Sequence, residues 1–265
     1  METSSAPRPV ALVTGASGGI GADIAVLLAA QKHDLVLVAR SRDKLAELAA
    51  KLEKEHGISV TVLTADLTDP GAPDLIAKVV REKGLVIDVL VNNAGLGSYG
   101  PFAEIDAKID LGLVALNVTS LTHMTKLFLP PMLAQKRGRI MNVGSTAGFV
   151  PGPLMAVYYA TKAYVLSLSV ALANEVAGSG VTVTCLCPGA TRTAFDTTAG
   201  NDKTRLFKGG VMDSMEVARA GVLATMRGDV ICVPGFMNRL KASTAGLAPR
   251  SLLAKIARSY QEPAP

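Results

Sequence analysis

The chain has 265 residues, 49% of them hydrophobic, which is enough to bury the core of one large domain. Its net charge of +5 is concentrated at the end of the chain, because residues 238–265 carry five basic side chains and one acidic one, or +4. The rest of the chain is close to neutral, which excludes a basic nucleic-acid-binding surface.

The chain begins with METSSAPRP (1–9), a polar and proline-rich segment without the apolar stretch of a signal peptide. We expect residues 1–9 to be a disordered tail, and likewise QEPAP at the other end. No apolar run reaches the roughly 18 residues that a membrane span needs. The three histidines are scattered, so we expect no metal site. Cys185 and Cys187 alternate in a strand-like segment and predict buried thiols in a reducing cytoplasm, not a disulfide framework.

Seven apolar strand candidates follow, separated by helix-like segments such as 19–31, 41–56 and 73–83. The strand candidates lie at 10–15, 34–39, 59–65, 88–93, 139–145, 181–187 and 230–235. Continuous apolar strands that alternate with amphipathic helices predict an α/β fold with a parallel sheet covered on both faces. No composition break divides the chain, so we expect one domain over 10–237 and a basic C-terminal extension over 238–265.

The first strand leads into TGASGGIG (14–21), which opens the first helix. Gly15, Gly19 and Gly21 allow a tight turn there and let backbone N–H groups approach a pyrophosphate at the helix N-terminus. A dinucleotide site that prefers NAD usually has an acidic residue at the end of the second strand, where this chain has Ala39 followed by Arg40. A guanidinium binds a ribose 2′-phosphate that a carboxylate would repel, so the pattern predicts NADP(H). Alternatively, Arg40 and Arg42 only solvate the start of a helix; of the two, Arg40 is the better phosphate candidate.

Tyr158 and Lys162 are one helical turn apart and therefore share a helix face. A free tyrosine titrates near ~10, so acid–base work near neutrality needs a shift of about three pKa units, or about 4 kcal/mol. A neighbouring lysine cation supplies part of it. Ser145, thirteen residues earlier, would hold the oxygen being protonated. The plainer interpretation is an amphipathic helix whose tyrosine packs and whose lysine reaches solvent; Tyr159 and Tyr164 lack a lysine four residues on and are expected to pack or to line a pocket.

From Val10 to Pro234 these motifs together resemble those of the short-chain dehydrogenase/reductase family, in its short single-domain branch. The resemblance implies a Rossmann-type doubly wound sheet of about seven parallel strands. It implies a catalytic tetrad of Asn117, Ser145, Tyr158 and Lys162. It also implies that the cofactor contacts Gly15, Ser17, Gly19, Ile20, Gly21, Arg40, Asp66, Leu67, Asn93, Ala94, Gly95, Tyr158, Lys162, Pro188, Gly189 and Thr193.

The function that the resemblance implies is reversible, NADP(H)-dependent reduction of a ketone or aldehyde, with Tyr158 as general acid and base. Lys162 would also hold the nicotinamide ribose, and Asn117 would anchor a water that connects Lys162 to solvent, or stabilise a helix irregularity, or both. The resemblance further implies a homodimer or homotetramer built from the helices that carry Asn117 and Tyr158. The alternative is a catalytically silent protein that binds NADP(H) as a sensor.

The substrate is predicted least well. Residues 193–212 match the position of the family's variable substrate loop, with Phe195, Leu206, Phe207 and Met212 as lid candidates. An apolar pocket is expected from Leu96, Gly97, Ser98, Tyr99, Phe149, Val150, Pro151 and Leu154, which favours a substrate with a hydrophobic body. A short amphipathic helix in the extension has Leu252, Leu253, Ile256 and Tyr260 on one stripe. We expect it to cover the site mouth or a subunit boundary, in preference to resting on a membrane surface.

Overall fold

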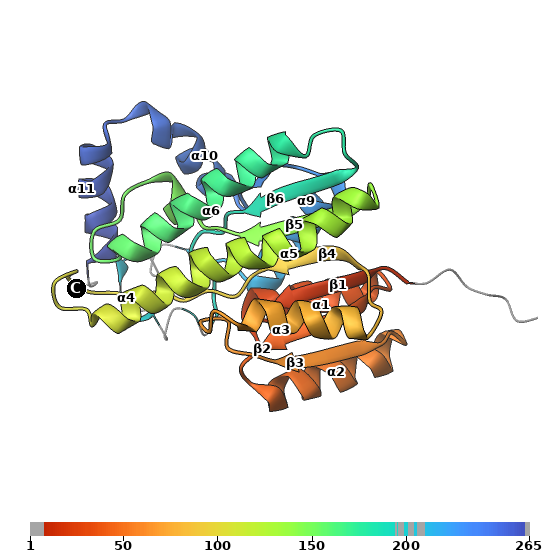
Figure 1. Cartoon of the computed structure of the whole chain (residues 1–265). Coiled ribbons are helices and arrows are strands. Elements are labelled where there is room, and N and C mark those ends of the chain that lie inside the picture. The colour runs from red at the N-terminus through yellow and green to blue at the C-terminus, as the bar shows by residue number, and fades with distance from the viewer. Residues whose placement is uncertain (1–7, 194, 196–198, 201–203, 206–209, 263–265) are drawn as a thin grey trace, which may run out of the picture.

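The protein folds around one sheet of seven parallel strands in the order β3-β2-β1-β4-β5-β6-β7 (Figure 1). This computed structural model describes residues 8–193, 195, 199–200, 204–205 and 210–262. The strands are β1 (Val10–Thr14), β2 (Asp34–Ala39), β3 (Val60–Thr64), β4 (Ile87–Asn92), β5 (Gly138–Val143), β6 (Val181–Leu186) and β7 (Ile231–Cys232). Each predicted strand is present, although β7 pairs with β6 over two residues only. The strand order reverses next to β1, so β1 and β4 end at the crevice where such sheets bind ligands.

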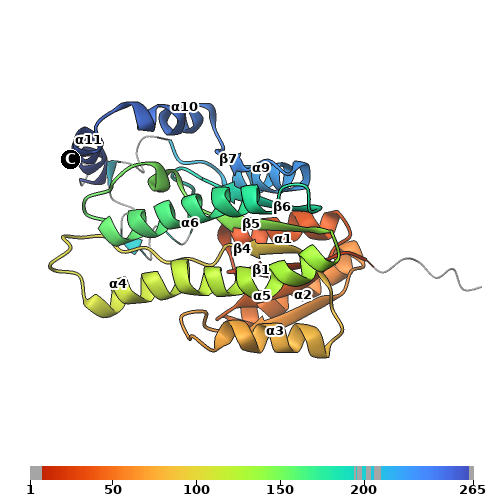
Figure 2. The same ribbon diagram turned by 45° about the horizontal axis from the view of Figure 1, so that its top comes forward.

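Helices cover both faces of the sheet, as Figures 1 and 2 show. One face packs against α1 (Gly19–Ala30), α2 (Arg42–His56) and α9 (Ser214–Arg227). The other face packs against α3 (Ala72–Glu82), α5 (Leu121–Ala134) and the end of α6 (Ala156–Glu175). Alternate strand residues supply the two cores: Ala11 and Val13 point to the first, and Val10 and Leu12 to the second. Burial on both faces explains why the strands are continuous apolar runs.

A π-helical segment interrupts the long helix that follows β4. α4 (Ala107–Val114) continues through η1 (Ala115–Ser120) directly into α5, and the backbone of η1 closes wider turns than an α-helix. This segment carries Asn117, which is 1% exposed. The helix irregularity that Asn117 was expected to stabilise is therefore present.

By length and composition alone, the α6 helix is apolar enough to cross a membrane, whereas no apolar run of that length was expected. In the fold, α6 packs against β6, η1 and the 3-10 turn η2 (Thr146–Phe149). It also carries Tyr158 and Lys162. Only 22% of this apolar stretch is buried inside the domain.

The C-terminal extension forms two helices and not the single short one expected. After α10 (Phe236–Thr244), a 3-10 turn η3 (Ala245–Leu247) leads to α11 (Arg250–Gln261). Figure 2 shows both helices at the same end of the molecule, beyond the carboxyl ends of the strands. At the other end of the chain, residues 1–7 of the expected tail lie outside the described residues. Arg8 and Pro9 are ordered: the Arg8 guanidinium donates to the Gly57 carbonyl (2.6 Å), and the Asp34 N–H donates to the Pro9 carbonyl (2.9 Å).

Candidate active site

The turn after β1 is shaped to receive an anion. Gly15 and Gly19 have φ values of +66° and +54°, which L-side chains rarely adopt. Helix α1 then begins after Gly18, with no side-chain cap and no acidic residue in its first turn. Gly18, Gly19 and Ile20 line a cavity, so the N-terminus of α1 offers its backbone N–H groups to that space. This arrangement fits the pyrophosphate of a dinucleotide.

Asn93 joins this turn to the end of β4. Its Nδ2 donates to the carbonyls of Thr14 (2.9 Å) and Gly15 (3.2 Å), while the Thr14 hydroxyl accepts from the backbone N–H groups of Asn93 (3.0 Å) and Ala94 (3.1 Å). Gly21, which was also expected to contact the cofactor, does not line the cavity. Instead, a Cβ at Gly21 would collide with the Gly15 carbonyl oxygen and with Asn93. Gly21 therefore serves the close packing of helix against turn.

Basic side chains follow β2 at the far end of the cavity. Arg40 lines it as predicted, together with Ser41 and Lys44, whereas Arg42 does not. Lys44 was not among the predicted cofactor contacts. It lies three residues after Ser41, in the first turn of α2, so its charge and position could have indicated a phosphate contact. Neither Arg40 nor Lys44 forms an ion pair with a side chain in the described part of the chain. Two cations on an open wall fit a 2′-phosphate.

Asp66, after β3, faces the same end of the cavity. Its Oδ1 accepts from the backbone N–H of Thr68 (3.0 Å) and from the Thr68 hydroxyl (2.8 Å). The backbone hydrogen bond, and more weakly the hydroxyl and the Arg40 guanidinium, lower the pKa of Asp66. Leu67, Ala94 and Gly95 line the cavity beside it, as predicted.

Lys162 is the buried member of the predicted tetrad. Its side chain crosses beneath the site, where Nζ donates to the Val143 carbonyl (2.8 Å) and lies 5.8 Å from the centre of the Tyr158 ring. Burial lowers the pKa of Lys162 to about 8, against a smaller opposing influence of the nearby thiols of Cys185 and Cys187. The lysine therefore does not reach solvent, and the simple amphipathic-helix interpretation is wrong.

Asn117 is tied to the backbone and not open to the cavity. Its Oδ1 accepts from the Leu96 N–H (2.9 Å), and its Nδ2 donates to the Leu96 carbonyl (2.9 Å) and to the Thr161 hydroxyl (3.1 Å). Asn117 Oδ1 and Lys162 Nζ both lie beside Gly95, each within 3.6 Å of the place that a Cβ would take. Asn117 thus fixes the loop after β4 next to the buried ammonium; a water relay through it stays a prediction.

Ser145 follows β5 and meets the turn after β6. Its hydroxyl donates to the Pro188 carbonyl (3.4 Å) and accepts from the Ala147 N–H (3.1 Å). Pro188, Gly189 and Thr193 line the cavity, and a Cβ at Gly19 would lie 3.1 Å from the Thr193 methyl group. The turn after β6 therefore closes over the glycine turn after β1, with Ser145 between them.

A single cavity of about 930 Å³ joins these parts and extends beyond them to an apolar half. Of the eight residues expected there, four line it, namely Leu96, Gly97, Phe149 and Val150. The other four do not line it, namely Ser98, Tyr99, Pro151 and Leu154. Among the lid candidates, the Phe195 ring lies 5.6 Å from the Tyr158 ring, whereas Met212 packs against the core cluster of α1 and α9. Leu206 and Phe207 lie outside the described residues.

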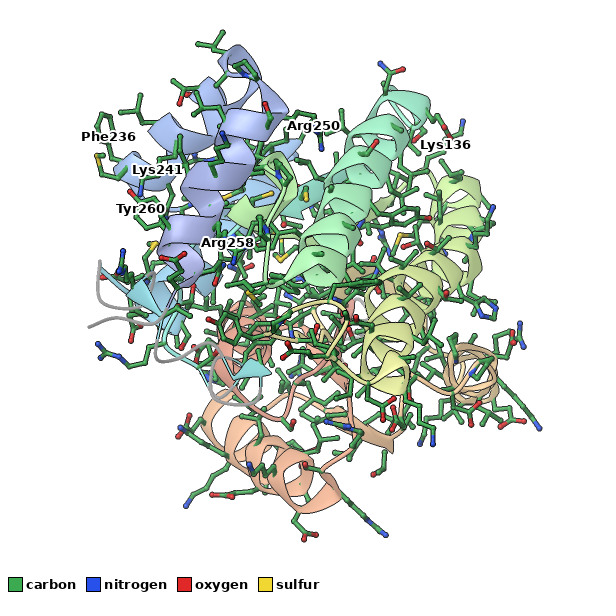
Figure 3. The ribbon with its side chains drawn as sticks, turned by 90° about the vertical axis from the view of Figure 1, so that its left-hand side faces the viewer. Lys136, Phe236, Lys241, Arg250, Arg258 and Tyr260 are labelled. Atoms are coloured by element: carbon green, nitrogen blue, oxygen red, sulfur yellow. The ribbon has the colours of Figure 1, made fainter. Side chains whose placement is uncertain are left out.

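The C-terminal helix α11 completes the wall. Leu253, Ile256, Ala257, Tyr260 and Gln261 line the cavity, so the helix covers the site mouth as expected, while Leu252 of the predicted stripe does not line it. Figure 3 shows α10 and α11 side by side, with Lys241 of α10 close to Tyr260 of α11; the ammonium is 5.4 Å from the centre of that ring.

Gln261 was missed, because it falls in the QEPAP segment that was expected to be disordered. That expectation is wrong for this residue, which is 1% exposed. Its carbonyl accepts from the Tyr99 hydroxyl (2.6 Å), and its Nε2 donates to the Tyr159 hydroxyl (2.7 Å). Polar composition at a chain end gave no signal of this burial.

The thiols of Cys185 and Cys187 are fully buried and lie 3.5 Å apart behind the site. The hydrogen bond between them, together with burial, raises the pKa of Cys187, which keeps that thiol neutral. Across the described residues, no cluster of three or more His, Cys, Asp or Glu side chains could hold a metal ion.

The family model described as short chain dehydrogenase matches residues 9–204 of this sequence. The chain belongs to the short-chain dehydrogenase family. Its relatives include the putative ketoacyl reductase 1 of the granaticin polyketide synthase from Streptomyces violaceoruber, 43% identical over 189 residues that cover 70% of this chain and 68% of the relative. The chain also matches very-long-chain 3-oxoacyl-CoA reductases, of which it covers little more than half the length.

Two solved structures of this family are similar over almost the whole chain. A short-chain dehydrogenase from Sphingobium yanoikuyae in complex with NADPH has a TM-score of 0.81 and 38% identity, with 90% of this chain and 94% of that chain covered. A bulky-bulky ketone specific alcohol dehydrogenase from Comamonas testosteroni has a TM-score of 0.78 and 34% identity, with 91% and 94% covered. The protein is thus an oxidoreductase of the short-chain dehydrogenase family, and its cavity fits NADP(H).

Proposed function

We propose that this short-chain dehydrogenase reduces a ketone or aldehyde to an alcohol with NADPH, reversibly, and that Tyr158 is its general acid and base. The observation that carries the proposal is the continuity of the cavity. It runs from Arg40 and Lys44, past the N-terminus of α1, to Ser145 and Tyr158, and on to the apolar wall of α11. One space therefore offers a place for a dinucleotide and a place for a second molecule next to the acid–base pair.

The nicotinamide, when bound, supplies the hydride for the carbonyl carbon. On the protein side, the Ser145 hydroxyl is placed to donate a hydrogen bond to the carbonyl oxygen, in place of its present bond to the Pro188 carbonyl. Tyr158 gives its proton to the oxygen as charge develops there. The Lys162 ammonium favours the phenolate that remains, and its burial strengthens this influence because few other dipoles screen it.

The preference for NADPH over NADH rests on Arg40 and Lys44. Both line the cavity where the second strand ends, and Ala39 leaves that place without a carboxylate. A carboxylate would bind the free 2′-hydroxyl of NADH and repel a 2′-phosphate. The structure from Sphingobium yanoikuyae, described as a complex with NADPH, supports the same choice.

The substrate is proposed to have a large apolar body. Phe149, Val150, Phe195, Leu253 and Ile256 line the half of the cavity beyond Tyr158, and apolar contacts with their side chains would hold a hydrophobic ketone. The ketone-specific enzyme from Comamonas testosteroni and the ketoacyl reductase relative support carbonyl compounds of this kind.

The test is the oxidation of NADPH by the purified protein with a panel of bulky ketones, aldehydes and 3-oxoacyl thioesters, followed at the absorbance of the reduced nicotinamide. The Tyr158→Phe variant removes the proton donor and keeps the ring that packs on Phe195, so we expect it to lose nearly all turnover while it still binds NADPH. General acid–base groups typically contribute about 10²- to 10⁴-fold. The Tyr164→Phe variant alters an exposed phenol on the same helix and is the matched control.

Turnover that survives in Tyr158→Phe would refute the proposed mechanism. Tight NADPH binding without turnover of any compound on the panel would favour the silent sensor instead. A sensor has no chemical need for Asn117, Ser145, Tyr158 and Lys162 together, so the proposal expects turnover.

We further propose that the enzyme is a homodimer or homotetramer joined through the helices around Asn117 and Tyr158. An apolar groove lies on that side, lined by Val114, Val118, Ala156, Val157, Ala160 and Thr161. Ile109 and Leu111 of α4, nearby in sequence, are 52% and 68% exposed, and exposed apolar side chains that gather in a patch mark interaction surfaces. Light scattering coupled to size-exclusion chromatography tests this, and Leu111→Glu is expected to yield monomers.

The cytoplasm is the proposed compartment. Cys185, Cys187 and Cys232 are all free thiols in the structure. Two buried thiols with sulfurs 3.5 Å apart fit a reducing environment. Fractionation of the source cells, followed by detection of the protein with an antibody, would decide the matter.

A further inference from the structure

The helices of the C-terminal extension use only one side to cover the site. Leu253, Ala257 and Gln261 of α11 line the cavity, but the extension also exposes large apolar side chains to solvent. Helix α10 has no buried residue, and its Phe236 and Met237 are 77% and 58% exposed. Covering the cavity therefore does not account for the outer side of the extension.

The exposed apolar side chains continue from α10 to the rim of the cavity. Leu247, in the turn η3 between the two helices, is 84% exposed, more than any other large apolar side chain in the described part of the chain. On α11, Leu252, Ile256 and Tyr260 recur every four residues and are each between 46% and 48% exposed. Ile256 and Tyr260 also line the cavity, so they stand where it opens to solvent. Exposed apolar side chains that gather in this way mark an interaction surface.

Positive charge lies beside these apolar side chains. Residues 238–265 carry five basic side chains and one acidic one, a net charge of +4. Among the five, Arg258 alone forms an ion pair within the described residues, with Glu262 at 3.8 Å. Figure 3 shows Phe236 and Lys241 of α10 on the same side of the extension as Tyr260 of α11. The extension thus presents apolar and cationic side chains together.

We propose that α10 and α11 form a docking surface for a membrane that contains anionic lipids. Exposed apolar side chains flanked by Lys and Arg are typical of helices that lie in a membrane interface. The long stems of Lys and Arg let the charges stay among the headgroups while the apolar side chains enter the lipid. The charge also decides against a second copy of this chain as the occupant, since two surfaces of net charge +4 would repel each other.

Docking in this way would turn the mouth of the cavity toward the lipid. A ketone with a large apolar body dissolves in the bilayer and could then pass Ile256 and Tyr260 into the cavity without crossing water. This route for the substrate rests on the carbonyl reduction proposed above, whereas the docking itself does not. The proposed cytoplasmic location agrees with it, because the cytoplasmic leaflet is the anionic one.

The first test is co-sedimentation of the purified full-length protein with vesicles of phosphatidylcholine, alone or mixed with phosphatidylglycerol. We expect binding to the mixed vesicles, weaker binding to the neutral ones, and release as the salt concentration rises. Each basic residue near an anionic surface contributes about fivefold in affinity, so Arg250→Glu combined with Lys255→Glu should weaken binding at least about 25-fold. Lys51→Glu combined with Lys54→Glu, at exposed positions of α2, makes the same change in net charge and should bind as the wild type does.

A second pair of variants tests insertion of the apolar side chains. Phe236→Ser combined with Leu247→Ser should weaken binding to the mixed vesicles about tenfold or more, because both side chains lose their burial in lipid. Neither residue lines the cavity, so the affinity for NADPH should stay unchanged. Leu75→Ser, at a position of α3 that is 63% exposed, is the control and should leave vesicle binding unchanged.

Equal binding of the wild type to both kinds of vesicle, or to neither, would overturn the docking surface. Unchanged binding of the Phe236→Ser and Leu247→Ser variant would overturn it as well, because adsorption by charge alone needs no apolar contact. If vesicles are not bound and light scattering shows that the same variant converts an oligomer to monomers, the surface belongs to a second copy of the chain and the proposal is wrong.

The route for the substrate has its own test. The wild type should reduce a long-chain ketone in mixed vesicles faster than the Arg250→Glu and Lys255→Glu variant does, while both reduce a water-soluble ketone at equal rates. Equal rates with both ketones would overturn the route. If no ketone is reduced at all, carbonyl reduction fails, and vesicle binding still decides the docking surface.

Discussion

The Lys162→Met substitution is expected to stabilise the cofactor-free protein while it abolishes catalysis. Burial lowers the pKa of Lys162 from its ordinary value of 10.5 to about 8. Each pKa unit corresponds to about 1.4 kcal/mol, so the buried ammonium costs about 3 kcal/mol of folding free energy at pH 7. Loss of the hydrogen bond to the Val143 carbonyl offsets about 1 kcal/mol of the gain, which leaves about 2 kcal/mol.

The sign of the pH dependence follows from the two protonation states. Below pH 8 both folded and unfolded chains hold the proton on Lys162, and the full cost of the buried charge is present. Between pH 8 and 10.5 the folded protein has released that proton and the unfolded chain has not, so the cost is relieved as the pH rises. The advantage of Lys162→Met should therefore shrink by about 2 kcal/mol between pH 7 and pH 10.

Urea unfolding at both pH values, without cofactor, measures this difference. Lys51→Met, at an exposed position of α2, is the control and should show no such pH-dependent gain. A Lys162→Met variant that is destabilised by the same amount at pH 7 and pH 10 would refute the reasoning. That result would mean that interactions with its surroundings stabilise the buried ammonium fully, so that its burial does not lower the folding free energy.

Three further substitutions test the cofactor site and its frame. Arg40→Ala should raise the KM for NADPH about 10- to 100-fold, the value of a charge-assisted hydrogen bond, with little change for NADH in steady-state kinetics. Asn117→Leu leaves the N–H and carbonyl of Leu96 without their buried partners, so urea unfolding should show a loss of about 3 kcal/mol. Gly15→Ala places a Cβ 2.7 Å from Asn93 Nδ2 at a φ of +66°, and we expect a loss of about 2 kcal/mol and of NADPH binding by calorimetry.

Each of these substitutions has a matched control in the chain. Arg42→Ala removes a neighbouring cation that does not line the cavity, and an equal effect on NADPH would contradict the assignment of Arg40. Asn174→Leu, at an exposed position of α6, should leave stability almost unchanged. Gly112→Ala in α4 meets no atom within 4 Å of its new Cβ and should stabilise the protein by about 0.5–1 kcal/mol. A stable Gly15→Ala variant would show that the turn after β1 can relax.

The sheet and most of the site were predictable from local sequence because their signals are local. Continuous apolar runs bounded by glycine predict strands that are buried on both faces, and all seven strands formed. Parallel strands end at one edge, so the motifs that follow them meet there. That geometry brings Gly15, Ser145 and Tyr158 into one cavity from positions far apart in the chain.

The errors came from contacts between distant segments. Gly21 carries the same local signal as its neighbours, but a Cβ there would collide with Asn93, which follows β4, so its role in packing depends on a distant residue. Gln261 lies in a short polar stretch that has the composition of a free chain end, and its burial depends on Tyr99 and Tyr159, which are more than 100 positions away. Lys44 lies in the first turn of α2, where a basic side chain more often contacts solvent than a ligand.

The π-helical turn in η1 makes the length of this part of the chain as important as its composition. One additional residue is accommodated where the helix from Ala107 to Ala134 widens, and the widened segment carries Asn117, whose side chain bonds to the Leu96 backbone. Deletion of one residue here would restore regular α-helical spacing and turn the two halves of the helix by about 100° relative to each other. A gap or insertion of a single residue in this segment should therefore separate active descendants from inactive ones. When genomes are searched for enzymes that work as this one does, an alignment without gaps from Ala107 to Ala134 is therefore a useful criterion.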